Sequence, residues 1–198
     1  MTTSYKRLDK TDAAVLLVDH QTGLLSLVRD FDPDRFKNNV LALADLAKYF
    51  ALPTILTTSF EDGPNGPLVP ELKETFPDAP YIARPGQINA WDNAEFVAAI
   101  EATGKKQLLI AGVVTEVCVA FPALSAIEAG YDVFVVTDAS GTSSVRSDSV
   151  CPKRGTRSTL RSPRSSSEGR LPTRISMSSR MESGAPSIRS RRPAIGAS

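Results

Sequence analysis

Apolar residues in this chain fall into short continuous runs, separated by segments with helical periodicity. Continuous runs predict β-strands that are covered on both faces. They lie at residues 13–18 ("AAVLLV"), 53–58, 81–83, 106–113 and 132–136. Between them, apolar residues recur every three or four positions, which predicts amphipathic helices. These helices are expected at 34–50, 93–103 and 115–130. Alternation of strand and helix is typical of a parallel sheet with right-handed crossovers.

The predicted helix boundaries rest on capping residues. Asp92 and Glu95 have the spacing of a capping box, which predicts that the second helix begins at residue 93. Gly104 follows that helix as a C-terminal capping residue. The intervening stretch 61–80 is rich in Pro and Gly and is predicted to be mostly loop.

Charge and composition divide the chain into two parts. Residues 1–141 hold 11 Lys and Arg and 19 Asp and Glu, a net charge of −8, and they contain every Phe, Tyr and Trp. Residues 142–198 hold 12 Lys and Arg and 3 Asp and Glu, a net charge of +9. We therefore expect a globular domain over 1–141 and a separate Ser/Arg/Pro-rich tail over 142–198.

Several classes of protein are disfavoured by the sequence. The polar N-terminal stretch has no signal-peptide pattern, and no apolar run approaches the length of a membrane span. Two cysteines make no disulfide framework, so a reducing cytoplasm is expected. A single histidine, His20, argues against a bound zinc. It is interpreted as structural, with a catalytic role as the alternative because a histidine pKa lies near neutral. No phosphate-binding glycine motif occurs, so no nucleotide cofactor is expected.

Three polar or reactive residues directly follow predicted strands. Asp19 follows the first strand, Arg84 the third, and Cys118 lies just after the fourth. Ligands of open parallel sheets bind beyond the carboxyl ends of the strands, so these residues share one rim. Each also has an ordinary structural role available to it, as a turn residue, a solvated charge or a packing cysteine. A thiol at a helix N-terminus is in turn expected to have a lowered pKa. Their joint placement favours a site.

Four separated motifs carry a resemblance to a known family. They are "AAVLLVDHQTGLLSLV", "TILTTSF", "ARPGQINAW" and "LLIAGVVTEVCVAFPALSAIEAGYDVFVVTDASGT". Over residues 10–142 the chain resembles the isochorismatase-like cysteine hydrolases, and within them the YcaC-like branch. The resemblance implies a Rossmann-like three-layer α/β/α fold with strand order 3-2-1-4-5-6. Here the sixth strand is expected to be missing.

The resemblance implies roles for the three rim residues. Cys118 matches the nucleophile and Asp19 the carboxylate that moves its proton, whereas Arg84 stands where most members have Lys. Arginine does not release its proton in a protein, so Arg84 is expected to act only as a fixed charge. The backbone N–H of Cys118 is a candidate oxyanion donor. The family implies a second donor at Val114, after a cis peptide between Val113 and Val114.

A hydrolase of this kind is expected to act on a small amide-like C–N bond through a covalent thioester, without metal or cofactor. Expected substrate-pocket residues are Gln21, Phe60, Asn89, Trp91 and Thr115. For Trp91, a place in the core or at a subunit interface stays an alternative. A small-molecule substrate is expected, and intact relatives are expected to be homo-oligomers. Neither a membrane nor a nucleic-acid partner is expected.

Two alternatives to an active hydrolase stay open. One is a catalytically silent oligomeric α/β protein, and the other is a truncated inactive product. The second follows from the tail, whose 16 Ser and 11 Arg come without aromatics or apolar periodicity. Such a segment buries too little surface to offset its ordering entropy, so we expect it to be disordered. Because the resemblance stops in mid-motif near residue 142, a frameshift is the preferred interpretation, with a natural basic extension as the other.

Overall fold

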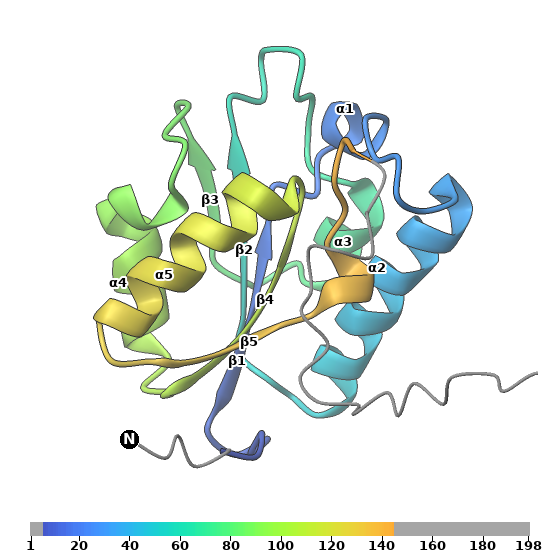
Figure 1. The fold of residues 1–198 in the computed structure, drawn as a ribbon. Coiled ribbons are helices and arrows are strands. Elements are labelled where there is room, and N and C mark those ends of the chain that lie inside the picture. The colour runs from blue at the N-terminus through green and yellow to red at the C-terminus, as the bar shows by residue number, and fades with distance from the viewer. Residues whose placement is uncertain (1–5, 145–198) are drawn as a thin grey trace, which may run out of the picture. The chain divides into compact units, whose positions relative to one another are not determined.

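Five parallel strands form the centre of the fold, in the order β3-β2-β1-β4-β5 (Figure 1). The computed structural model describes residues 6–144. The strands are β1 (Ala13–Val18), β2 (Thr54–Ser59), β3 (Tyr81–Arg84), β4 (Gln107–Gly112) and β5 (Asp132–Val135). The five predicted strands are thus confirmed in number and direction. Their order matches the family order as far as the fifth strand.

Helices cover both faces of this sheet (Figure 1). One side carries α2 (Pro33–Tyr49) and α3 (Pro70–Thr75), with α1 (Thr22–Leu25) near the upper edge in that view. On the opposite side lie α4 (Ala94–Ala102) and α5 (Ala120–Glu128). Two separate hydrophobic clusters fill the spaces between sheet and helices. The three-layer α/β/α architecture expected from the sequence is therefore confirmed.

The central strand β1 shows why its sequence is uniformly apolar. All six of its residues are fully buried. Val15 and Leu17 pack into the cluster beneath α2, whereas Leu16 and Val18 pack into the cluster beneath α4 and α5. Successive side chains of a strand point to opposite faces, so a strand covered on both sides needs apolar residues at every position.

Local structure differs from the sequence prediction at several places. The loop predicted over 61–80 contains α3, which begins at Pro70, a favourable first helical residue. The predicted capping box at Asp92 is wrong, because Asn93 caps α4 by accepting a hydrogen bond from the Phe96 N–H. Gly104 has a positive φ of 66° after α4, as its predicted capping role requires.

The helix predicted from residue 115 has two parts. One turn of π-helix, Thr115–Val119, precedes the α-helix α5. Turns of this kind are rare and often occur at functional sites, and this one contains Cys118. The short helix α1 was not predicted at all, because four residues are too few to show a period.

The predicted tail, 142–198, lies outside the described residues except for its first three. Two structural units, residues 1–152 and 153–198, make up the chain, and every described residue lies in the first. Thr142 is buried, its N–H donates to Asp30, and its hydroxyl donates to Glu116. These contacts join Thr142, the first residue of the predicted tail, to the domain.

Strand β5 forms one edge of the sheet over the described residues. Beside it, α5 exposes three large apolar side chains, those of Phe121, Leu124 and Ile127. An exposed strand edge next to apolar surface favours association.

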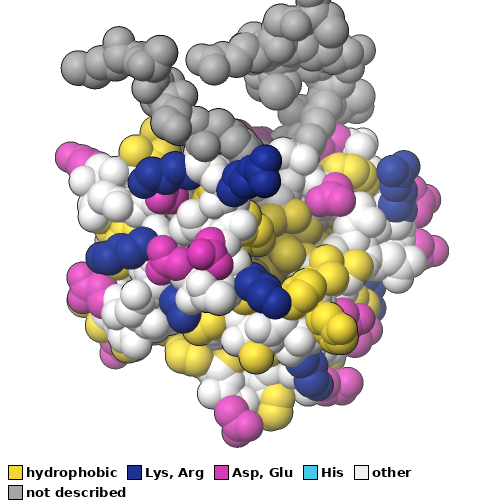
Figure 2. Space-filling model, turned by 90° about the horizontal axis from the view of Figure 1, so that it is seen from below, with side chains coloured by type: hydrophobic (Ala, Val, Ile, Leu, Met, Phe, Trp, Pro, Cys, Tyr) yellow, Lys and Arg dark blue, Asp and Glu magenta, His cyan; other side chains and the backbone are white. Residues whose placement is uncertain are grey.

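The surface seen from below in Figure 2 carries charges of both signs. Lys and Arg side chains lie among Asp and Glu side chains, around a hollow with hydrophobic walls. Within residues 6–144, none of the helices has the length and apolar character that crossing a membrane requires.

Candidate active site

Asp19 lies where β1 ends and the chain turns sharply. Its φ of 58° falls in the left-handed region, which Asp tolerates better than most residues but which often marks a functional position. The Asp19 N–H donates to the Thr57 carbonyl and the Gln21 N–H donates back to the Asp19 carbonyl. These bonds hold the carboxylate at the rim of the sheet, where only 2% of the residue is exposed.

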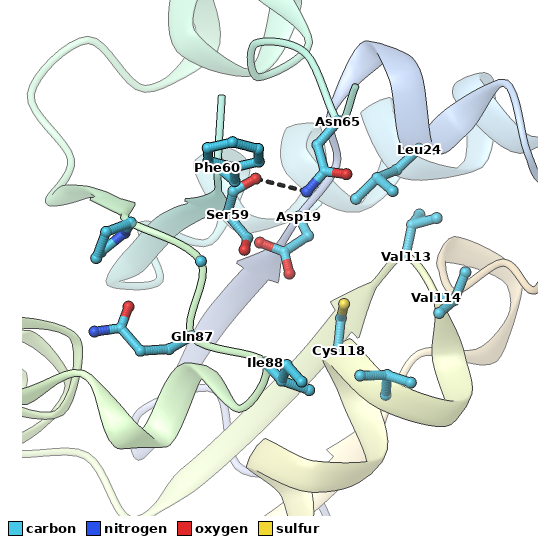
Figure 3. Close-up of a pocket in the computed structure, with 13 residues that line it drawn as sticks. Asp19, Leu24, Ser59, Phe60, Asn65, Gln87, Ile88, Val113, Val114 and Cys118 are labelled. Carbon is cyan, nitrogen blue, oxygen red and sulfur yellow. Dashed lines mark hydrogen bonds between the residues drawn. The ribbon is translucent and has the colours of Figure 1, made fainter. Parts of the chain in front are cut away.

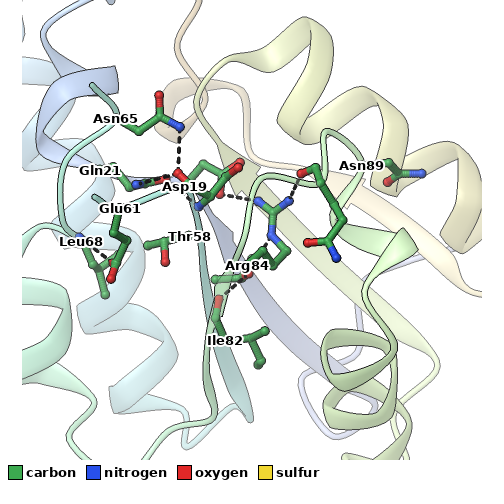
Figure 4. Close-up of polar contacts among 12 residues, drawn as sticks. Asp19, Gln21, Thr58, Glu61, Asn65, Leu68, Ile82, Arg84 and Asn89 are labelled. Atoms are coloured by element: carbon green, nitrogen blue, oxygen red, sulfur yellow. Dashed lines mark hydrogen bonds and ion pairs between the residues drawn. The ribbon is translucent and has the colours of Figure 1, made fainter. Parts of the chain in front are cut away.

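Arg84 ends β3 and is the largest fully buried side chain among residues 6–144. Its guanidinium donates through all three nitrogens (Figure 4). Nη2 pairs with the Asp19 carboxylate at 2.5 Å, Nε donates to the Thr57 hydroxyl at 3.0 Å, and Nη1 donates to the Gln87 carbonyl. A lysine ammonium lacks this planar fork, so the arginine is built into this site as a bound positive charge.

Cys118 faces Asp19 across a cavity (Figure 3). The thiol and the Asp19 carboxylate lie close enough for each to shift the pKa of the other. Burial raises the pKa of the Cys118 thiol far above its ordinary value, and the negative charge of Asp19 raises it further. Arg84 and a hydrogen bond from the Val114 backbone act in the opposite direction, with smaller effect. The expectation of a thiol pKa lowered by the helix N-terminus is therefore wrong: the resting group is a thiol.

Asp19 is affected by the same surroundings. Burial raises the pKa of the Asp19 carboxyl, while the charge and hydrogen bond of Arg84 hold it back, followed by the Cys118 hydrogen bond. Arg84 thus serves Asp19 more directly than it serves the sulfur. A buried carboxylate, paired on one side with a cation and on the other with a thiol, is placed to accept the thiol proton.

The chain between β4 and the helix carries a non-proline cis peptide, Val113–Val114, as the family resemblance implied. Two contacts with Gly141 hold this segment. Val113 forms a β-bridge with Gly141, and the Thr115 N–H donates a hydrogen bond to the Gly141 carbonyl. The Cys118 N–H donates to the Val114 carbonyl at 2.8 Å, so this predicted oxyanion donor already has an acceptor. A substrate oxyanion bound to the Cys118 N–H would share this donor with the Val114 carbonyl.

A cavity of about 480 Å³ opens over these groups. Asp19 and Cys118 line it, together with Phe60 from the loop after β2 and Ile88 from the loop after β3 (Figure 3). Its remaining walls come mainly from aliphatic side chains, including Leu24, Val113, Val114 and Val117. The cavity thus brings together segments that are distant in sequence, as expected at the carboxyl edge of a parallel sheet.

Of the five predicted pocket residues, Phe60 lines the cavity and four lie elsewhere. Asn89 caps a short 3-10 turn by accepting from the Trp91 N–H, and its amide donates to Ser125. Trp91 packs edge-on against Phe96 and Tyr131, in agreement with the alternative of a core role.

The other two, Gln21 and Thr115, are structural. Gln21 is fully buried and ties the end of β2 to the loop that follows, since its amide donates to the Ser59 and Gly66 carbonyls and accepts from the Ser59 N–H. Thr115 donates through its hydroxyl to the Gly141 carbonyl. Both positions adjoin the site in sequence, but their side chains turn away into backbone contacts.

Asn65 and Leu24 line the cavity but were missed from the sequence. Asn65 reaches it because its loop packs against the start of α1, where the Gly23 N–H donates to the Asn65 carbonyl at 2.8 Å. A Cβ on Gly23 would lie 2.0 Å from the Pro64 carbonyl oxygen. A glycine directly before an apolar pair was therefore the available signal for this close approach.

His20 lies beside Asp19 in sequence but outside the cavity. It is fully buried, and one ring nitrogen bonds to the Ala139 carbonyl at 3.0 Å. Burial lowers the pKa of His20 to about 4, so the ring is neutral near pH 7. Among residues 6–144, His, Cys, Asp and Glu side chains form no group of three or more able to hold a metal ion.

The family is settled by comparison with known proteins. Residues 13–150 match the Isochorismatase domain. Over 142 residues, which are 72% of this chain and 68% of the relative, the sequence is 84% identical to a probable hydrolase, YcaC, of Escherichia coli strain K12. The chain belongs to the isochorismatase-like family, and YcaC is a near relative.

Two solved structures are similar in both fold and sequence. The YcaC gene product of Escherichia coli, described as an octameric hydrolase of unknown specificity, aligns with a TM-score of 0.70 at 84% identity over 71% of this chain and 69% of that one. YcaC from Pseudomonas aeruginosa, with hexane-2,5-diol and covalent acrylamide, aligns with a TM-score of 0.70 at 82% identity over 71% and 70%. The octameric relative agrees with the expectation that intact relatives are homo-oligomers.

A more distant structure shares the fold alone. A nicotinamidase of Staphylococcus aureus aligns with a TM-score of 0.57 at 17% identity, over 67% of this chain and 84% of that one. The three-layer architecture is thus common to proteins of widely different sequence.

Proposed function

We propose that this hydrolase-family protein cleaves a small amide-like C–N bond through a thioester on Cys118, without a metal. The observation that carries the proposal is the buried ion pair of Arg84 and Asp19 beside the half-buried Cys118, with Asp19 and Cys118 lining the same cavity. A nucleophile, a base within hydrogen-bond reach and a group that orients the base are the parts that covalent catalysis requires.

The proposed first half-reaction forms the thioester. The Cys118 thiol gives its proton to Asp19 as the sulfur attacks the amide carbonyl carbon. The backbone N–H groups of Val114 and Cys118 stabilise the resulting oxyanion, which is the role that the family implies for them. Asp19 then returns the proton to the amide nitrogen, the C–N bond breaks, and the amine or ammonia leaves.

The second half-reaction restores the enzyme. A water molecule gives one proton to Asp19 and attacks the thioester carbonyl. The C–S bond breaks, the acid leaves, and the sulfur recovers its proton from Asp19. Arg84 transfers no proton in either half and holds the Asp19 carboxylate in its ionised form and orientation.

A raised thiol pKa is compatible with this scheme. The thiolate does not need to exist at rest, because Asp19 removes the proton as the sulfur attacks. Acrylamide, covalently present in the Pseudomonas aeruginosa relative, combines an amide with a carbon that nucleophiles attack. Its presence there supports a reactive nucleophile and a pocket that accepts an amide.

Replacement of Cys118 tests the proposal. Against a panel of small amides, the wild-type protein should hydrolyse at least one, and Cys118→Ser should lose at least about a thousandfold in kcat/KM, because the nucleophile of a coupled site is removed. Cys151→Ser is the matched control and should leave the rate unchanged. Circular dichroism of both variants should match the wild type.

Full turnover by Cys118→Ser, or no hydrolysis of any amide by the wild-type protein, would contradict the proposed function. The second result would favour the catalytically silent alternative. Only measured turnover distinguishes that alternative from an active enzyme, because the fold and the buried contacts would be the same in both.

A further inference from the structure

We infer that the cavity selects uncharged amides with a short aliphatic acyl part and discriminates against substrates that carry a carboxylate. The inference deepens the proposed function and rests on it, because it assigns a substrate class to the same cavity. The charges at the cavity, its walls and the fate of the product each support it.

The first support is the balance of charge. Asp19 is the charged side chain among the described residues that line the cavity, and no Lys, Arg or His lines it. The nearby cation, Arg84, is unable to pair with a substrate, since its side chain is 0% exposed and its three nitrogens already donate to Asp19, Thr57 and Gln87. A carboxylate entering the cavity would meet Asp19 with no cation free to pair with it.

The second support is the nature of the walls. The aliphatic side chains of Leu24, Val113 and Val117 line the cavity. Phe60 and Ile88 line it as well and are 52% and 67% exposed. Exposed apolar side chains beside a reactive group gain from being covered by an apolar ligand. A cavity of about 480 Å³ lies in the lower part of the range for small-molecule sites, so the acyl part is expected to be short.

The backbone of Phe60 fixes this residue at the cavity. Its φ of 50° is left-handed, and its N–H donates to the Arg84 carbonyl at 2.9 Å. Phe60 thus follows β2 directly, its backbone is tied to the end of β3, and its side chain lines the same cavity as Asp19 (Figure 3). A bulky aromatic residue in this conformation indicates a local requirement, because it is strained unless its surroundings fix it.

The third support is product release. Hydrolysis of a neutral amide gives a carboxylic acid, which ionises near pH 7. The resulting anion lies next to Asp19 without a free cation, so the charge that disfavours anionic substrates also expels the product. A neutral substrate and an anionic product are therefore treated differently by the same cavity.

Two alkylating agents test the inference without requiring turnover. Iodoacetamide carries a neutral amide where iodoacetate carries a carboxylate, and the two reagents are otherwise the same. Each forms an S–C bond at Cys118 as iodide leaves and the thiol proton passes to Asp19 or water. Rates are followed by mass spectrometry of the Cys118 peptide at one alkaline pH, with N-acetylcysteine as the free-thiol reference. The ratio of iodoacetamide to iodoacetate rates should be at least about tenfold larger for Cys118 than for the reference, because Asp19 repels the anion.

A matched pair of variants assigns the discrimination to cavity charge. Ile88→Lys places a cation at the rim, whereas Ile88→Gln changes polarity at similar length without charge. Iodoacetate alkylation of Cys118 should rise about tenfold in Ile88→Lys and should change little in Ile88→Gln, since a nearby cation concentrates anions. Iodoacetamide reports any general change of access in either variant.

A wild-type ratio equal to or below that of N-acetylcysteine would overturn the inference, as would equal responses of the Lys and Gln variants. This failure differs from failure of the proposed function. A protein that hydrolyses amides but does not discriminate refutes the charge selection alone. A protein that discriminates between the two reagents but hydrolyses nothing supports the charge selection and refutes the proposed function.

Discussion

Asp19→Asn should lower kcat/KM for amide hydrolysis by about 10²- to 10⁴-fold, the usual contribution of a positioned general base. The amide keeps the shape of the side chain but has no proton-accepting carboxylate. Asp19 also raises the pKa of the Cys118 thiol, so its removal should increase thiolate content at a given alkaline pH. Hydrolysis and alkylation by iodoacetamide should therefore change in opposite directions.

This opposition separates proton transfer from simple damage. A distorted site would lower hydrolysis and alkylation together, and that result would contradict the assigned role of Asp19. Asp45→Asn, an exposed position on α2, is the control for loss of one carboxylate and should alter neither rate. Urea unfolding of both variants gives the free energy of unfolding needed to compare them.

Arg84→Met should abolish most activity and destabilise the domain. Breaking a buried ion pair by removing one partner typically costs about 3–5 kcal/mol, because the other charge is left buried and unpaired. Without Arg84, the pKa of Asp19 rises further, so the acidic limb of the pH profile of kcat/KM should move to higher pH. Arg84→Lys keeps the charge and should shift this limb less, although it loses the fork to Thr57 and Gln87.

The sign of the stability change with pH follows from the same shift. The folded-state pKa of Asp19 lies above its unfolded value in Arg84→Met, so the folded protein binds the proton more tightly. Stability from this group is then present at acid pH and is lost as pH rises through the folded-state pKa. The deficit relative to wild type should therefore be larger near neutral pH than in acid.

A double variant completes this test. Asp19→Asn combined with Arg84→Met leaves no unpaired charge, so its free energy of unfolding should exceed the additive expectation from the two single variants. Strict additivity, or an acidic limb that is identical in wild type, Arg84→Lys and Arg84→Met, would show that Arg84 does not act through Asp19.

The sequence predicted the sheet well because burial on both faces has a clear pattern. Strand β1 has no polar residue between Ala13 and Val18, and a short apolar run bounded by polar residues is typical of a strand buried on both faces. Short helices carry no comparable pattern. Helix α3 lies in a stretch whose prolines suggested loop, and there Pro70 begins a helix.

The positions of the three catalytic candidates could be predicted from the sequence, but the pKa of the Cys118 thiol could not. The ends of parallel strands meet at one edge, so Asp19, Arg84 and Cys118 were placed together by topology alone. The pKa of the Cys118 thiol depends on how deeply it is buried and on which group Arg84 contacts. Neither is visible in a sequence, and the expectation from the helix N-terminus had the wrong sign.

The pocket walls were the least predictable part. Gln21 and Thr115 lie next to catalytic positions in sequence, yet they bond to the backbone of neighbouring loops. Asn65 enters from a loop whose conformation depends on close packing against Gly23. Contacts of this kind arise between segments far apart in the chain, and a single sequence carries no periodic signal for them.

Detection of an acyl group on Cys118 tests the central claim most directly. The wild-type protein is mixed with its best amide substrate, and the reaction is quenched in acid at short times. The masses of the Cys118 and Cys151 peptides are then measured by mass spectrometry. Hydroxylamine in a parallel reaction intercepts a thioester as the hydroxamate. We predict the acyl mass on the Cys118 peptide alone, with formation of hydroxamate. Hydrolysis that proceeds with neither an acylated Cys118 nor a hydroxamate would contradict covalent catalysis by this residue.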